Sequence, residues 1–160
     1  MRERETLARA VYTRWQQVIV DEEDGSRGAE VEGAPEAVLD AFERRYGVAL
    51  PRSFRELYQL SDGTAVMDGH EQIFWPIGAI ARTLDSFDPG DPQALWVGFA
   101  DYRLQTTVFF LRADRGTGST SVWIDQLSRD KPFPARLVKL AESFDAYLQR
   151  YAEDPLFWRG

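Results

Sequence analysis

The order of the predicted elements indicates an α+β fold with a mostly antiparallel central sheet. Three stretches with helical spacing of apolar residues come first, three consecutive strand-like runs follow between residues 95 and 125, and an amphipathic helix closes the sequence. This order favours α+β over the alternating βαβ pattern of a parallel sheet. The 160 residues match the size of one domain, so we expect a single domain over residues 1–160.

Three helices are predicted before the first strand. The first spans residues 5–20, and its apolar face consists of Leu7, Val11, Trp15 and Val18. The second begins near Pro35 and ends at Gly47, residues favoured at helix starts and helix ends. Its inward positions are expected to be Val38, Leu39, Phe42 and Tyr46. The third lies in LPRSFRELYQLSDG, begins near Pro51 and is expected to end at Gly63.

The second half of the sequence predicts a sheet and a closing helix. The run IFWPIGAI, residues 73–80, has the composition of a strand interrupted by Pro76, and a short helix is expected after it. Strands are expected at residues 95–100, 106–112 and 120–125, and their short connections favour antiparallel pairing. The closing amphipathic helix is expected to carry Leu137, Leu140, Ala141, Phe144, Tyr147, Leu148 and Tyr151.

The composition excludes several classes of protein. Cysteine is absent, which rules out disulfides, thiolate metal sites and a cysteine nucleophile. The net charge of −7 argues against direct binding to nucleic acid or to an anionic membrane, since both need Lys and Arg. No apolar run approaches the ~20 residues of a membrane span, and no signal peptide is apparent. We therefore expect a cytoplasmic protein without a cofactor or a metal.

Most of the negative charge lies in one acidic window, residues 62–101. It contains a single base, Arg82, and the acids Asp62, Asp68, Glu71, Asp85, Asp88, Asp91 and Asp101. Seven acids and one base give −6, so the rest of the sequence is almost neutral. An acidic window of this kind either keeps a protein soluble or forms an interface for a basic partner.

Two short motifs have the residue types of active sites but fit loops better. Residues 68–71, DGHE, hold the only histidine, without the HExxH spacing or the second ligand cluster of a metal site. Residues 115–120, RGTGST, lack the Gly-Lys-Ser/Thr ending of a phosphate loop and precede a strand, which favours a hairpin turn. No GxSxG motif accompanies the solitary histidine, so an enzyme is the least favoured class.

Several segments, in this order, resemble the SUKH superfamily, whose best-known branch is the Smi/Knr type. They are FERRYGVALP, LPRSFRELYQLSDG, FWPI, WVGFADY, TVFFLR, VWID and LAESFDAYL, and they cover most of residues 35–150. The sequence departs from the family pattern at Asp62, where the family often has Asn, and in the N-terminal helix with its DEEDGSRG loop.

This resemblance implies binding rather than catalysis and supplies no catalytic residues. Bacterial members are typically cytoplasmic immunity proteins that block a toxin domain, often a nuclease or another nucleic-acid-modifying enzyme, and a fungal branch acts as a regulatory scaffold. We therefore predict an immunity protein that neutralises a toxin domain through an acidic face. The alternative is a regulatory or scaffold module that binds an endogenous protein. The predicted binding residues are Asp62, Asp68, Glu71, Trp75, Asp101 and Tyr102, with Trp75 either a core residue or an interface anchor.

Overall fold

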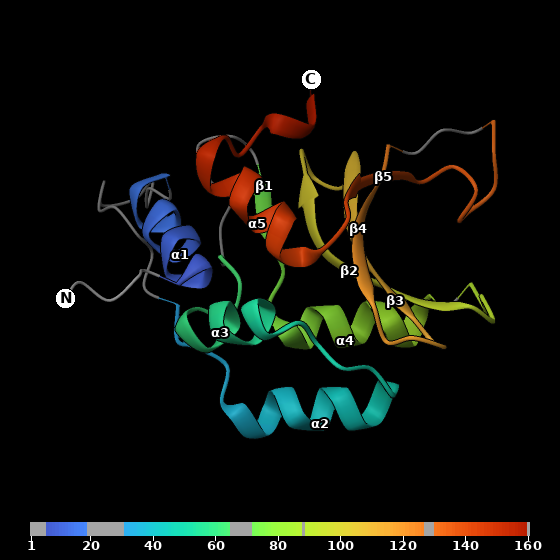
Figure 1. The fold of residues 1–160 in the computed structure, drawn as a ribbon, viewed down its shortest axis with the longest axis horizontal. Coiled ribbons are helices and arrows are strands. Elements are labelled where there is room, and N and C mark those ends of the chain that lie inside the picture. Colours follow the sequence, from blue (N-terminus) through green and yellow to red (C-terminus); the bar gives the residue numbers. More distant parts are fainter. Residues whose placement is uncertain (1–5, 19–30, 65–71, 88, 127–129, 160) are drawn as a thin grey trace.

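The computed structural model describes residues 6–18, 31–64, 72–87, 89–126 and 130–159. In this part of the chain, five α-helices pack against a five-stranded sheet (Figure 1). The strands follow one another in sequence order across the sheet, and each pairs antiparallel with the next. The predicted α+β class and the antiparallel pairing of the three predicted strands are therefore confirmed.

The elements are short and closely connected. The helices are α1 (Leu7–Val18), α2 (Glu36–Tyr46), α3 (Arg52–Leu60), α4 (Ile77–Ser86) and α5 (Phe144–Glu153), followed by a 3-10 turn, η1 (Phe157–Arg159). The strands are β1 (Gln72–Phe74), β2 (Ala94–Tyr102), β3 (Thr107–Asp114), β4 (Thr120–Asp125) and β5 (Val138–Ala141). Because the order is sequential, β1 and β5 form the two edges of the sheet.

Aromatic side chains join the helices to one face of the sheet. Phe144 of α5 lies 5.2 Å from Phe54 of α3 and 5.6 Å from Phe99 of β2, measured between ring centroids. Helix α1 packs across α3 and α5, and its Trp15 ring lies 4.9 Å from Phe74 of β1. Such rings bury large apolar areas, so this face carries the main core of the protein.

Helix α3 is the most sharply defined of the predicted helices. Its apolar residues at i, i+3 and i+4, Phe54, Leu57 and Tyr58, are fully buried, and Pro51 occupies its N-cap. The helix ends at Leu60, so the prediction that Gly63 is its terminus was wrong by one turn. Ser61 already has an extended backbone, and the chain turns there toward the edge of the sheet.

Gly63 lies where the chain passes close to β1. Its φ angle is +78°, and a Cβ atom at this position would lie 2.5 Å from the carbonyl oxygen of Phe74 and 2.8 Å from the nitrogen of Pro76. Next to it, the N–H of Thr64 donates to the Phe74 carbonyl at 3.0 Å. Only glycine combines this backbone conformation with so close an approach, so Gly63 allows residues 61–64 to cover the outer edge of β1.

Two predicted segments differ from the structure. Residues 77–80 begin α4 instead of continuing a strand, because Pro76 sits at the helix N-cap with φ of −65°. Residues 138–141 form β5 and pair with β4, so the closing helix starts at Phe144 instead of near Leu137. Ser143 fixes this start, since its hydroxyl accepts a hydrogen bond from the Ala146 N–H at 3.0 Å.

One side chain of α2 faces away from the core, contrary to the prediction. Val38 is 42% exposed, whereas Leu39 and Phe42 are buried as expected. The backbone of Gly47 has φ of +64° and ends α2 as predicted.

We predict that Leu57→Ala lowers the free energy of unfolding by about 2–5 kcal/mol, the usual loss for truncating a buried leucine. Gln59→Ala is the matched control, because Gln59 lies on the same helix and is exposed. Chemical denaturation of both variants measures the effect. Similar unfolding midpoints for the two variants would contradict the placement of α3 in the core.

We also predict that Gly63→Ala is far more destabilising than Gly118→Ala. Both glycines have positive φ, +78° and +72°, but a Cβ at Gly118 would meet no heavy atom of the described residues within 4 Å. The free energy of unfolding of Gly118→Ala should therefore fall only by the cost of the left-handed backbone, about 1–2 kcal/mol. Gly63→Ala should lose more, because its Cβ also overlaps the backbone of Phe74 and Pro76. Equal losses in a denaturation experiment would show that the approach to β1 is unimportant.

Candidate functional site

The acids of the acidic window do not form one surface in the described part of the chain. Asp91 and Asp101 lie at opposite ends of β2, whose nine residues extend roughly 26 Å. Asp85 projects from α4 and pairs with Arg45 of α2 at 2.7 Å. Asp68, Glu71 and Asp88 lie outside the described residues, as does His70 in the DGHE motif.

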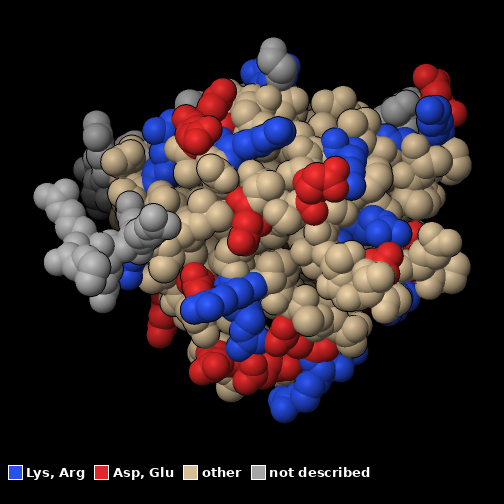
Figure 2. Space-filling model, in the orientation of Figure 1, with Lys and Arg blue, Asp and Glu red and all other residues tan. Residues whose placement is uncertain are grey.

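Acids and bases are also mixed on the face that Figure 2 displays. The lower part of this view lies over α2, where Glu36, Asp40 and Glu43 all approach the guanidinium of Arg55. This one guanidinium offsets part of the charge of the three carboxylates. Among the described acids of residues 62–101, Asp85 is likewise paired, with Arg45, so the negative charge of this window is spread over the structure and partly neutralised.

Asp101 lies inside the protein and connects two structural features. Its side chain is 4% exposed, and one carboxylate oxygen accepts a hydrogen bond from the indole N–H of Trp75 at 2.6 Å. The other oxygen accepts from the backbone N–H of Gln105 at 3.1 Å. The predicted acidic face does not extend to Asp101, because both of its oxygens are used within the protein.

Tyr102 is also buried, with 6% of its surface exposed. Its ring meets Trp158 of η1 edge to face at 4.9 Å between centroids, so the C-terminal turn folds back onto the sheet. The guanidiniums of Arg103 and Arg159 lie 5.3 and 5.6 Å from the same ring. The Tyr102 ring is therefore covered by Trp158, Arg103 and Arg159 and packs against them in the unbound protein.

Trp75 is a predicted binding residue whose side chain is partly exposed. It is half-buried, and its ring lies over Gly98 of β2, where a Cβ atom would approach the indole to 3.0 Å. Gly98 faces the side of the sheet opposite α5, where Phe110 also lies. The absence of a side chain at Gly98 and the hydrogen bond to Asp101 together hold the indole against this outer face.

The outer face of the sheet carries a second aromatic cluster that the sequence analysis did not identify. Trp96 contacts Trp123, Phe133 and Phe110 edge to face, with centroids 5.5 to 6.5 Å apart. The indole N–H of Trp96 donates to Asp91 at 2.9 Å, and this hydrogen bond is the main reason why the pKa of Asp91 is lowered. The sequence signal for this cluster is that successive residues of β2 and β3 point to opposite faces of the sheet and are apolar on both faces.

Asp62 lies beside the start of α4 and is half-buried. Its carboxylate accepts a hydrogen bond from the backbone N–H of Ile77 at 2.7 Å, which satisfies one of the free donors of the helix N-terminus. Burial raises the pKa of Asp62 above its ordinary value of 3.8, and the Ile77 hydrogen bond opposes this rise only in part. Asp62 and Trp75 thus flank the same short segment that leads into α4.

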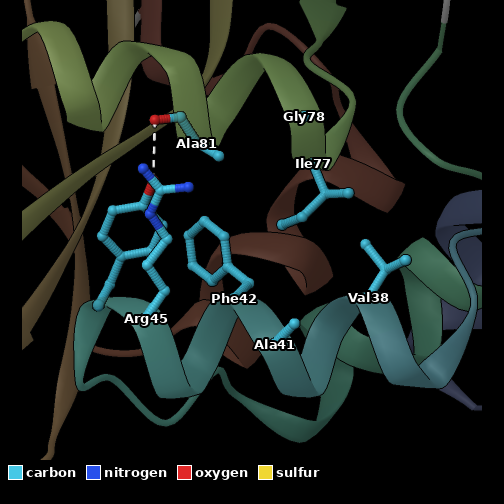
Figure 3. A pocket seen from close by; sticks show the side chains of 8 residues that line it. Val38, Ala41, Phe42, Arg45, Ile77, Gly78 and Ala81 are labelled. Carbon is cyan, nitrogen blue, oxygen red and sulfur yellow. Dashed lines mark hydrogen bonds between the residues drawn. The ribbon is translucent and has the colours of Figure 1, made fainter.

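A shallow apolar groove of about 170 Å³ lies between α2 and α4 (Figure 3). It is lined by Val38, Ala41, Phe42, Arg45, Tyr46, Ile77, Gly78 and Ala81. Its two polar side chains are engaged, since the Tyr46 hydroxyl donates to the Ala81 carbonyl at 3.0 Å and Arg45 pairs with Asp85. The groove therefore presents apolar surface without a polar group that would orient a substrate.

Within the described ranges, no group of three or more His, Asp or Glu side chains is placed to hold a metal ion. Over the same residues, no helix has the length and apolar character needed to cross a membrane.

We predict that Asp62→Asn stabilises the protein relative to wild type as the pH rises through the acid range. A carboxyl group whose folded-state pKa is raised contributes stability at low pH and loses it as the pH passes the folded pKa. Asn keeps the acceptor for the Ile77 N–H without the buried charge. Asp62→Ala is the control: it removes both the charge and the acceptor, so its stability should follow that of Asp62→Asn with pH and lie about 1 kcal/mol below it. If the free energies of unfolding of wild type and Asp62→Asn change in parallel from about pH 3 to about pH 7, burial does not raise the pKa of Asp62.

Comparison with known proteins identifies the family of this chain. A family model described as SMI1 / KNR4 family (SUKH-1) matches residues 33–150, more than two thirds of the sequence. The match begins just before α2, includes the whole sheet and ends within α5. A search of curated proteins found no match. The chain therefore belongs to the SMI1/KNR4 (SUKH-1) family, as the order of its sequence segments predicted.

Proposed function

We propose that this protein is an immunity protein that binds and neutralises a toxin domain in the cytoplasm. Family membership is the observation that carries the proposal, because SUKH proteins act by binding other proteins in immunity and scaffold roles. The half-buried Trp75, the acids of the acidic window and a groove without substrate-orienting groups fit a protein partner. A toxin domain that acts on nucleic acid has a basic cleft for phosphates, and an acidic protein complements such a cleft.

The proposed binding surface centres on Trp75 and the acids that precede β1. Asp68 and Glu71 lie in the stretch between Thr64 and Gln72, and both flanking residues are buried at the β1 edge. Gln72 is fixed there, since its side-chain amide donates to the Pro155 carbonyl at 2.6 Å. Trp75 follows three residues later in the sequence. Asp62, Asp101 and Tyr102 support this surface, because their side chains hold the surrounding backbone and rings.

The proposal is tested by co-expressing this protein with each candidate toxin domain that a neighbouring gene encodes. Wild type should restore the growth of cells that express the toxin, and the purified pair should form a stable complex. Growth arrest with no complex would contradict toxin neutralisation and favour the regulatory scaffold.

We predict that reversing the charges of Asp68 and Glu71 to Lys slows association with the toxin and weakens its dependence on salt. Electrostatic steering raises association rates from about 10⁵–10⁶ toward 10⁸–10⁹ M⁻¹s⁻¹ at low salt, so its loss appears mainly in the association rate. The measurement is the association rate constant as a function of ionic strength.

The matched control is the double variant Glu142→Lys/Glu153→Lys, which changes the net charge equally. Both control residues are exposed, and Glu142 has only a surface pair with Lys139. Asp145 is unsuitable, because its carboxylate accepts a hydrogen bond from the buried Ser53. If both double variants slow association equally, the acids before β1 have no special role and the binding surface lies elsewhere.

A further inference from the structure

The hairpin between β2 and β3 contains an unusual left-handed turn. Arg103, Leu104 and Gln105 have φ angles of +47°, +52° and +69°. They are the only described residues other than glycine with positive φ. A left-handed conformation brings Cβ close to the following carbonyl oxygen, so L-residues rarely adopt it in succession. No glycine relieves the turn, although four described glycines occupy such conformations elsewhere.

Hydrogen bonds from the strand ends hold this turn in place. The Tyr102 carbonyl accepts from both the backbone N–H and the hydroxyl of Thr106, at 3.1 and 2.9 Å. The carboxylate of Asp101 accepts from the Gln105 N–H. Backbone strain persists where the surroundings over-determine it, and such positions cluster at functional sites. The turn is therefore a rigid feature that costs the protein stability.

The turn places an apolar side chain in solvent. Leu104 is 81% exposed, whereas the next most exposed large apolar side chain of the described residues, Val138, is 57% exposed. A single exposed leucine is ordinary on a protein surface. Leu104 differs because it lies at the centre of a strained turn held by hydrogen bonds. In the free protein, burial of its side chain does not compensate for this strain.

The same carboxylate positions the turn and Trp75. Asp101 binds the Trp75 indole with one oxygen and the Gln105 backbone with the other. Asp101 thus positions both the Trp75 ring and the turn that carries Leu104 before a partner arrives. A fixed geometry lowers the entropy cost of association, and buried aromatic and apolar anchors at the centre of an interface carry most of its binding energy.

We propose that Leu104 is an anchor residue that enters an apolar pocket of the toxin domain; this inference rests on the proposed function. The charge beside the turn specifies the rim of that pocket. Arg159 is exposed, and its guanidinium lies over the Tyr102 ring next to the hairpin. In a protein partner, the group that matches a planar guanidinium is a carboxylate, so the pocket is apolar at its base and has a carboxylate at its mouth.

The test uses the full-length protein and the toxin domain from the co-expression experiment. Leu104→Gly and Leu104→Asn remove the apolar side chain and suit the left-handed backbone. Both variants should unfold at denaturant concentrations no lower than wild type, and their Kd for the toxin should rise by about tenfold or more. Gln105→Gly is the matched control, because it relieves the neighbouring left-handed residue, keeps the N–H that binds Asp101 and should leave the Kd unchanged.

Charge reversal tests the rim of the pocket. Arg159→Glu should weaken binding, whereas Arg52→Glu on α3, where the side chain is 93% exposed, should not. Equal Kd values for Arg159→Glu and Arg52→Glu would overturn the claim that a carboxylate at the rim of the pocket pairs with Arg159.

Two results separate the inference from the proposed function. If wild type binds the toxin and both Leu104 variants bind equally well, the anchor is wrong and toxin neutralisation stands. If wild type neither binds nor neutralises the toxin, the proposed function fails, and the assigned role of Leu104 fails with it.

Discussion

The close approach between residues 61–64 and 74–77 is the constraint on which the rest of the structure depends. Gly63 lies against the backbone of Phe74 and Pro76 at a distance that admits no side chain. The contact brings the Asp62 carboxylate to the start of α4 and lets the Tyr58 hydroxyl donate to the Trp75 carbonyl at 2.7 Å. Helix α3, the edge strand and α4 thereby form one unit, and the position of Trp75 on the outer face follows from it.

Local signals were sufficient for the elements that the sequence predicted correctly. Pro51 and the i, i+3, i+4 spacing of Phe54, Leu57 and Tyr58 specify a helix without reference to the rest of the chain. Strand β5 has no such signal, because Leu140 and Ala141 fit an extension of the α5 pattern equally well and form a strand only by pairing with β4. The start of α4 was missed for a related reason, since an apolar run containing Pro76 suits either a broken strand or a helix start.

The candidate site was only partly visible in the sequence, because a count of charges does not reveal where carboxylates point. Asp91 and Asp101 both accept hydrogen bonds from tryptophan indoles, contacts that join residues five and 26 positions apart. Trp75 was identified from its position before Pro76, and the structure places it at the surface as a half-buried ring. The left-handed turn at Leu104 contains neither Gly nor Asn, the residues that signal such a conformation, so no sequence pattern reveals it.

The contact between Trp75 and Gly98 links the evolution of two positions that lie far apart in sequence. A Cβ at position 98 would lie 3.0 Å from the indole, so a residue larger than glycine there displaces the ring and favours a smaller residue at position 75. A partner that selects for tryptophan at the surface therefore also selects for glycine in the strand beneath it. In related proteins these two positions should vary together, and a strand residue that the partner never touches would change whenever the recognised surface changes.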